Sequence, residues 1–335
     1  MRTRIVLILL AVLTIVLFAG GLFLGSVDIP AGEVIDALRG KSDESISSII
    51  VLETRLPAVA TSALAGMALA LAGLLMQTAF SNPLAGPSIM GISSGASLGV
   101  ALVLLAFPSV LGAWGRVATI GSAFLGAMAV MLVLAAFSSL VRSSTLLLIV
   151  GILTGYLTSA AITLLNFFAS SESVHSYVLW GLGSFSSVSL GDLPWLTALC
   201  LSLGAMAIFF AKPLDALLLG ERYAANSGVE VGRIRTLLLV LSGALTAVVT
   251  AWCGPIGFIG LAVPHIARLL IGSNAHRRLI PATALCGAAT GLLCQILSTV
   301  PANAYGVLPV NAITPLIGVP VIVYVLLRRK KLSFT

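Results

Sequence analysis

The side chains that could do chemistry are few, and they do not form a reactive set. All four cysteines lie in apolar segments without a C-x-x-C pair, which favours packing over disulfides or metal ligands. Gly40-Lys41-Ser42 ends like a phosphate-binding loop, but Ile35 stands where that motif needs its first glycine. The sequence therefore predicts no catalytic residue, no metal site and no ATP site of this kind.

The acidic residues avoid the apolar segments. Asp215, Glu221 and Glu230 share one loop, and the others lie in or beside loops predicted on the opposite side. Carriers driven by protons or sodium commonly use carboxylates or histidines inside the membrane, and here only His265 lies near a helix interior. Ion coupling is therefore disfavoured, and a partner is expected to supply the energy. The alternatives are an ion-coupled secondary carrier that works without an ATPase, and a purely structural membrane scaffold.

Membrane helices must position these groups. The mean hydropathy of +1.14, with 59% hydrophobic and 9% charged residues, is typical of a polytopic membrane protein. At about 20 residues a span, the chain has room for roughly ten helices. We expect an all-α fold in one transmembrane domain, residues 1–335. The predicted spans are 5–24, 56–80, 87–107, 117–140, 144–168, 193–211, 235–252, 256–271, 280–300 and 307–327.

The ends and loops predict an orientation. Residues 5–24 are long enough to span, although a cleaved signal peptide is the alternative. Residues 26–54 form a polar loop whose start predicts a short amphipathic surface helix. Ten spans place both termini on one side, and all basic residues except Arg39, Lys41, Arg55 and Arg116 then fall on that side. The positive-inside rule predicts that both termini are cytoplasmic, and the basic tail faces anionic lipid rather than nucleic acid.

The stretch from Arg55 to Ala96 organises the chain. It begins with an expected Arg-Leu-Pro cap, continues as a helix rich in small residues such as Gly66 and Gly73, and breaks at Ser81-Asn82-Pro83-Leu84. Small residues allow helices to approach closely in lipid. An irregular backbone survives there only when it is buried in protein or faces water. This stretch is therefore expected to form the inner wall of a transporter.

The longest inner loop, residues 212–235, is expected to bind a partner. Its sequence predicts a short helix, a break at Gly220 and a second short helix that ends at Gly228. Leucines at 214 and 217–219 would be exposed unless something covers them. An ordinary solvated loop is the alternative.

Three motifs together resemble one family. The first is Arg55-Leu56-Pro57 with the helix to Gln77, Asn82-Pro83-Leu84-Ala85-x-Pro87 and Gly91-x-x-x-Gly95-Ala96. The second runs from Gly254-Pro255-Ile256-Gly257 to Pro264-His265 and Arg268, and the third is Leu308-Pro309-Val310 with Pro315 and Gly318-Val319-Pro320. Their order resembles that of FecCD-type permeases, the membrane subunits of ABC importers for ferric siderophores, haem and vitamin B12.

The resemblance implies a ten-helix subunit in the bacterial inner membrane that forms a homodimer around a central pathway. Two cytoplasmic ATPase subunits would bind ATP and magnesium, so this chain needs no cofactor and is not itself an enzyme. A periplasmic or lipid-anchored binding protein would deliver the substrate. A ferric siderophore is the first expected cargo, with haem or cobalamin next.

The resemblance also implies roles for individual residues. ATPase docking is expected at Glu221, Arg222, Ala224, Ala225, Ser227 and Gly228. The translocation gate is expected at Asn82, Pro83, Leu84, Ser143 and Ser144, and the pathway lining at Gln77, Tyr156 and Asn166. The signature residues with a structural role are Gly254, Gly257, Phe258, Gly260, Pro264, His265 and Arg268. Arg55 is expected to dock the binding protein.

Several of these roles have alternatives. Asn82 is also a good helix cap, and Arg55 could anchor its span at the interface. His265 invites a haem-ligand interpretation, but a hydrogen-bonded structural histidine is more ordinary. Two positions depart from the family pattern: Ala58 replaces a second docking arginine, and Gln295 replaces an aspartate.

Overall fold

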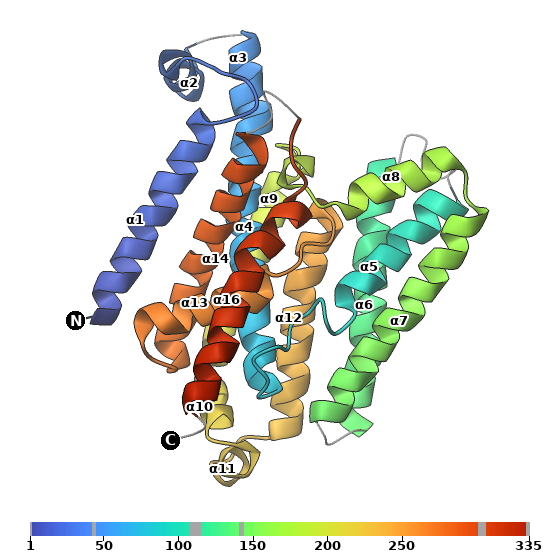
Figure 1. Ribbon diagram of the computed structural model, residues 1–335, viewed down its shortest axis with the longest axis vertical. Coiled ribbons are helices and arrows are strands. Elements are labelled where there is room, and N and C mark those ends of the chain that lie inside the picture. The colour runs from blue at the N-terminus through green and yellow to red at the C-terminus, as the bar shows by residue number, and fades with distance from the viewer. Residues whose placement is uncertain (1, 42–44, 108–114, 141–143, 301–305, 333–335) are drawn as a thin grey trace.

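The computed structural model describes residues 2–41, 45–107, 115–140, 144–300 and 306–332, and over this part every regular element is a helix (Figure 1). The helices are α1 Arg2–Phe23, α2 Ala31–Leu38, α3 Ile46–Ile49, η1 Ile50–Arg55, α4 Leu56–Ala79, α5 Ile92–Ala101, η2 Leu102–Ala106, α6 Gly115–Leu140, α7 Ser144–Phe168, α8 Ser171–Gly181, η4 Phe185–Ser187, α9 Leu193–Phe209, α10 Ala211–Leu218, α11 Glu221–Asn226, α12 Val231–Cys253, α13 Ile259–Ile271, α14 His276–Thr299 and α16 Val310–Leu332.

Helices that can cross a membrane account for most of the described chain. Six are long and apolar enough to span, and α9 with α10 makes a seventh, bent by 54°. Three shorter apolar helices, Ile92–Ala106, Ile259–Ile271 and Val310–Val325, correspond to the remaining predicted spans. The all-helical, multi-span prediction is confirmed, with six to ten spans.

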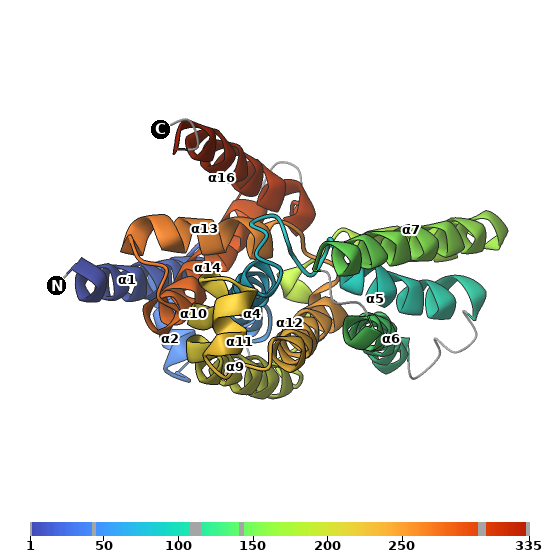
Figure 2. The same cartoon turned by 90° about the horizontal axis from the view of Figure 1, so that it is seen from below.

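Helix α4 is the centre of the fold. It packs against α9, α12, α13 and α14, while α5, α6 and α7 form a second group that joins the first where α6 contacts α12. Figure 2 shows the loop after α4 between α16 on one side and α7 on the other. We call this segment, residues 80–91, the Pro83 loop. The end of the molecule that carries α10 and α11 is the α11 end, and both α1 and α16 have their chain ends towards it (Figure 1).

The small residues of α4 allow the close helix packing that the sequence predicted. A Cβ built on Gly66 would lie 2.2 Å from the backbone oxygen of Gly287 on α14, and one on Gly73 would lie 1.7 Å from that of Gly260 on α13. Only glycine permits such backbone approach. Pro264 contributes to the second contact, because its missing N–H frees the Gly260 carbonyl from a helical bond.

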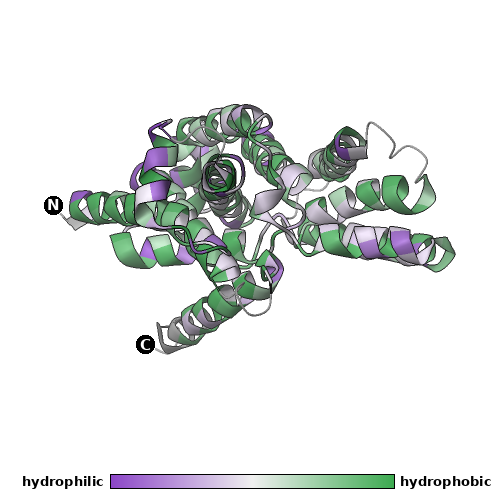
Figure 3. Cartoon of the chain, turned by 90° about the horizontal axis from the view of Figure 1, so that it is seen from above, coloured by the Kyte–Doolittle hydropathy of each residue, from purple (hydrophilic) through white to green (hydrophobic). Residues whose placement is uncertain are grey.

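Apolar side chains cover much of the outward helix surface. Large residues such as Ile8, Leu9 and Ile15 on α1 are more than half exposed. Seen from above, the helix ribbons carry mostly the green of hydrophobic residues (Figure 3). This distribution is what lipid contact requires.

The start of α4 corrects one prediction. The Arg-Leu-Pro segment is not a cap, because residues 46–55 are already helical and run on into α4 as one 34-residue helix, Ile46–Ala79. The turns of Ile50–Arg55 are widened to the π form. Wider turns leave room for Pro57, which cannot donate a helical hydrogen bond, so the proline does not end the helix.

The short helix that was expected at the start of the polar loop is present as α2.

Two other helices differ from prediction, one in where it begins and one in being present at all. Helix α5 begins at Ile92, later than the predicted residue 87, because Gly91 adopts a left-handed conformation (φ 78°) before it. Helix α8 was not predicted. It begins after Ser170, whose hydroxyl caps it, and its mixed polar and apolar residues give no strong pattern.

Candidate gate and docking site

The end of α4 is shaped for a tight turn. Ser81 adopts a left-handed conformation (φ 47°), its N–H bonds to the Thr78 carbonyl at 3.1 Å, and the N–H of Asn82 bonds to the Gln77 carbonyl at 3.0 Å. These paired bonds form a Schellman motif, a common helix end that usually places glycine where Ser81 stands. The motif fixes the direction in which the Pro83 loop leaves the helix.

Asn82 then stabilises the loop itself. Its side-chain oxygen accepts a hydrogen bond from the N–H of Leu84 at 2.9 Å, and its carbonyl accepts one from Ala85 at 3.1 Å. This is an Asx turn, so Asn82 caps a turn rather than a helix. Leu84 is exposed at the loop surface, whereas Ala85 is buried.

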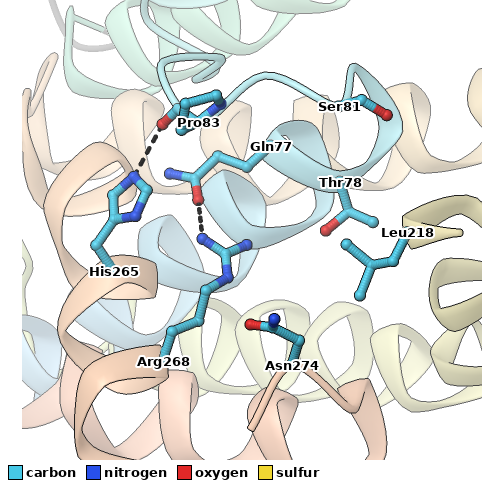
Figure 4. A pocket seen from close by; sticks show the side chains of 8 residues that line it. All are labelled: Gln77, Thr78, Ser81, Pro83, Leu218, His265, Arg268 and Asn274. Atoms are coloured by element: carbon cyan, nitrogen blue, oxygen red, sulfur yellow. Dashed lines mark hydrogen bonds between the residues drawn. The ribbon is translucent and has the colours of Figure 1, made fainter. Parts of the chain in front are cut away.

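The second sequence motif holds the first in place. Nε2 of His265 lies 3.0 Å from the carbonyl oxygen of Pro83, and Nη1 of Arg268 donates to Oε1 of Gln77 at 2.6 Å. The amide nitrogen of Gln77 donates in turn to the carbonyl of Leu261 at 3.0 Å. Figure 4 shows both side chains of α13 reaching across to the end of α4. Two motifs almost 200 residues apart thus form one hydrogen-bonded unit.

A pocket of about 240 Å³ opens beside this unit. It is lined by Gln77, Thr78, Ser81, Pro83, Leu218, His265, Arg268 and Asn274 (Figure 4). The pocket joins the end of α4 to α10, to α13 and to the residues before α14. Six of its eight lining residues are polar, Arg268 among them, and both α10 and the Pro83 loop contribute to its lining.

His265 has a structural partner in the bond to Pro83, which supports the ordinary interpretation of this residue over haem ligation. Among the described residues, no three His, Cys, Asp or Glu side chains come close enough to hold a metal ion.

The glycine-rich start of α13 is held from α16. The side chain of Asn311 accepts a hydrogen bond from the N–H of Gly257 at 3.1 Å and donates to the carbonyls of Pro255 (2.6 Å) and Gly181 (3.2 Å). Phe258 has a positive φ of 65°, which is rare outside glycine. Gly254 also has a positive φ, whereas a Cβ on Gly257 would meet nothing within 4 Å. Sequence analysis missed Asn311, although it directly follows the Leu308-Pro309-Val310 motif.

The predicted docking loop contains the two expected short helices, α10 and α11, separated by Gly220 (φ 107°). On α11, Ala224 is buried, while Arg222 and Ala225 are exposed, as are Ser227 and Gly228 directly after the helix. Glu221 forms an ion pair with the buried Arg235 of α12.

All four leucines of this loop were expected to be exposed, but only two of them are. Leu214 and Leu217 are buried in the core, because α10 folds back against α4, α9 and α14. Leu218 and Leu219 are 46% and 66% exposed, so an apolar surface remains at this end.

Three residues that sequence analysis did not single out as site residues connect α10 to α4. Oδ1 of Asp215 lies 2.8 Å from both the backbone nitrogen and Nδ1 of His276, the first residue of α14. Nε2 of His276 lies 3.0 Å from the hydroxyl oxygen of Thr78. A signal existed in the sequence: Asp215 is an acidic residue in a short apolar helix, and His276 begins a span.

Other predicted site residues lie away from the pocket. Tyr156 is 72% exposed on α7, and Oδ1 of Asn166 is buried without a hydrogen-bond partner in the described structure. Ser144 begins α7, and Ser143 lies outside the described residues.

Arg55 is buried at the opposite end of the molecule. Its guanidinium donates to the carbonyls of Leu22 and Phe23, each at 3.0 Å, and to that of Val27. These bonds satisfy the end of α1. A role for Arg55 in docking a binding protein stays a prediction.

Comparison with known proteins agrees with this geometry. The model of the FecCD transport family matches residues 12–328. The vitamin B12 import system permease protein BtuC of Klebsiella pneumoniae is 35% identical over 97% of this chain and 92% of the relative, and that of Vibrio cholerae is 34% identical over 85% and 84%. A solved structure of a proposed metal-chelate type ABC transporter in an inward-facing conformation has a TM-score of 0.83 and 27% identity, covering 97% of this chain and 99% of that one.

These matches cover nearly the whole chain and include all three motifs. A permease of this kind works with an ATPase and a binding protein and needs no cofactor of its own. The chain therefore belongs to the FecCD transport family and is a permease subunit of an ABC importer, not its ATP-hydrolysing part.

Proposed function

We propose that the chain forms the translocation pathway of an ATP-driven importer for a bulky metal chelate, with the Pro83 loop as its inner gate. The observation that carries this proposal is the meeting of the Pro83 loop, α13 and α10 around one pocket. Because Leu218 of α10 lines the same pocket as Ser81 and Pro83 of the loop, we expect a movement of α10 to affect the loop there. The whole chain, residues 1–335, acts as one transmembrane domain in this proposal.

The acidic residues support a chelate rather than a bare cation as cargo. The sequence has none between Glu53 and Glu172 and none after Glu230, a range that includes α4 to α7 and α12 to α16. A bare metal ion in the membrane would need anionic ligands. A chelate carries its own ligands and needs only a wide, neutral wall. The same distribution disfavours the ion-coupled carrier.

Cobalamin is the cargo to test first, because the relatives described above are vitamin B12 import permeases. Nothing in the comparisons favours the ferric siderophore that we expected first. Ferric siderophore and haem are therefore outcomes of the same test.

Helix α7 supports a second permease copy as a partner. Tyr156, Ser159 and Thr163 are exposed and lie three and four positions apart, so they form one polar stripe on the helix. A polar stripe is costly against lipid and suits a water-filled pathway between two protomers. We infer a homodimer with this stripe facing the pathway.

The other partners follow from the two ends of the molecule. The exposed residues of α11, with Leu219 beside them, are proposed to dock into one ATPase subunit per protomer. The binding protein is proposed to dock at the opposite end, near α2 and α8. The positive-inside rule makes the α11 end cytoplasmic, so both termini lie in the cytoplasm.

Reconstitution tests this proposal. The chain is placed in proteoliposomes with the ATPase and the binding protein, and uptake of labelled cobalamin, ferric siderophore and haem is measured with and without ATP. Uptake of one chelate that requires ATP and both partners is the expected result. Uptake that follows an ion gradient without ATPase would overturn the proposal.

A further inference from the structure

We propose that Asp215, His276 and Thr78 form a hydrogen-bonded link that carries movement of the docking helices to the Pro83 loop. The inference rests on the proposed function, because it assigns three positioning residues to the coupling between ATPase and gate. None of the three belongs to the motifs that the sequence analysis used to assign site residues.

The first half of the link joins α10 to α14. Asp215 accepts two hydrogen bonds from His276, one from the backbone N–H and one involving Nδ1, each at 2.8 Å. The carboxylate also lies at the N-terminal end of α14, where the helix dipole attracts negative charge. Bonds to a charged group are about twice as strong as neutral ones. Helix α10 is therefore held to the first residue of α14.

The second half joins α14 to α4. His276 is fully buried, and its Nε2 lies 3.0 Å from the Thr78 hydroxyl, which is also buried. Thr78 follows Gln77, and its carbonyl receives the Ser81 N–H in the turn that starts the Pro83 loop. A displacement of His276 therefore acts on the residue that sets the direction of the loop.

The link holds in either protonation state of the imidazole. When only Nδ1 carries a proton, it donates to Asp215, and the Thr78 hydroxyl donates to Nε2. When both nitrogens carry protons, Nε2–H donates to Thr78, whose hydroxyl then donates to the Leu74 carbonyl 3.1 Å away. Both geometries keep three helices connected.

Helix α10 also packs directly on α4 and α14, and the link adds a hydrogen-bonded path to this packing. Leu214 and Leu217 already bury α10 in the core, so Asp215 is not needed to cover apolar surface. The Asp215 side chain is 42% exposed at the α11 end, while its partner is fully buried. A half-exposed carboxylate bonded to a buried histidine thus connects the docking surface to the interior.

The test uses the complete complex in lipid nanodiscs, with Leu84→Cys in the Pro83 loop as a reporter. The four native cysteines are buried, so a maleimide reports on position 84. Labelling rates are compared without nucleotide and with ATP plus vanadate. The variants are Asp215→Ala, which removes the accepting oxygen, His276→Phe and Thr78→Val, with Thr78→Ser to restore the hydroxyl. Asp36→Ala and Thr119→Val make the same chemical changes outside the link.

We expect nucleotide to change the labelling rate at least about fivefold in the unmodified chain, the lower end of ordinary coupling between sites. Each link variant should lose most of this change while ATPase subunits still co-purify and still hydrolyse ATP. Thr78→Ser and both controls should keep it. Asp215→Ala combined with Thr78→Val should lose no more than either alone, because both act through His276.

Three results would overturn the link. The link variants could keep the full nucleotide response, the controls could lose as much as the variants, or the double variant could be additive. Failure of the proposed function gives a different result, because nucleotide would then leave the labelling rate of position 84 unchanged even in the chain without link variants.

Discussion

The imidazole of His265 lies 3.0 Å from the carbonyl oxygen of Pro83, although 182 positions separate them in the chain. This contact attaches α13 to the irregular loop that ends α4. With the bond from Arg268 to Gln77, it makes the loop a supported element rather than a free connection. A loop that is supported from a separate helix can be released when that helix or its neighbours move.

Replacing His265 should loosen the Pro83 loop. His265→Leu removes the hydrogen bond to Pro83, a loss of about 1 kcal/mol, which raises opening of the loop roughly fivefold. Maleimide labelling of Leu84→Cys should become faster by that factor. His175→Leu in α8, where the histidine is exposed, is the matched control and should leave the rate unchanged. An unchanged rate in His265→Leu would show that the bond does not restrain the loop.

Gly73→Ala should prevent folding, because the new methyl group would overlap the Gly260 backbone, which cannot move aside. We expect no monodisperse protein on size-exclusion chromatography after membrane extraction. Gly121→Ala on α6 adds the same methyl group where nothing lies within 4 Å, and it should fold normally. Normal folding of the Gly73 variant would contradict the packing of α4 on α13.

Arg55→Leu should destabilise the end of α1. The guanidinium donates to three carbonyls, and the loss of charged hydrogen bonds to buried groups costs about 1.5 to 3 kcal/mol. Thermal unfolding in detergent should show a lowered Tm. Arg39→Leu, at the exposed end of α2, should not lower it. An unchanged Tm together with weaker binding of the binding protein would instead favour the docking role of Arg55.

Asn311→Leu should release the connection between α8, α13 and α16. Its side chain makes three hydrogen bonds to backbone groups, so we expect a loss of about 2 kcal/mol and a lowered Tm. Asn226→Leu, on the exposed end of α11, is the comparison at which stability should not change. Equal stability of the two variants would refute the structural role of Asn311.

The sequence contains the span pattern because lipid demands long apolar helices, which leave a clear signal in any single segment. The break at Pro83 and the two docking helices carry equally local signals in their prolines and glycines. The bonds of His265 to Pro83 and of Asp215 to His276 could not be predicted in this way. Each joins residues far apart in the chain, and only the packing of α4, α13 and α14 brings them together.

Two predictions made from local sequence were wrong because the surrounding structure changes the outcome. Pro57 normally marks a helix start, but widened turns before it allow the helix to continue from Ile46. By its place in the loop, Leu214 would be exposed unless something covered it, and the bend between α9 and α10 buries it in the chain's own core. In both cases the tertiary fold outweighs the local preference.

Co-purification of the ATPase tests the central claim most directly. The tagged chain is extracted gently from its native membrane, and the proteins that accompany it are quantified by mass spectrometry. Ala225 is exposed on α11, so Ala225→Arg should block docking without disturbing the fold, while Ala225→Ser should not. We predict a stoichiometric ATPase subunit with the unmodified chain and with Ala225→Ser, and its loss with Ala225→Arg. A chain that comes out without ATPase and alone moves substrate along an ion gradient would contradict the account.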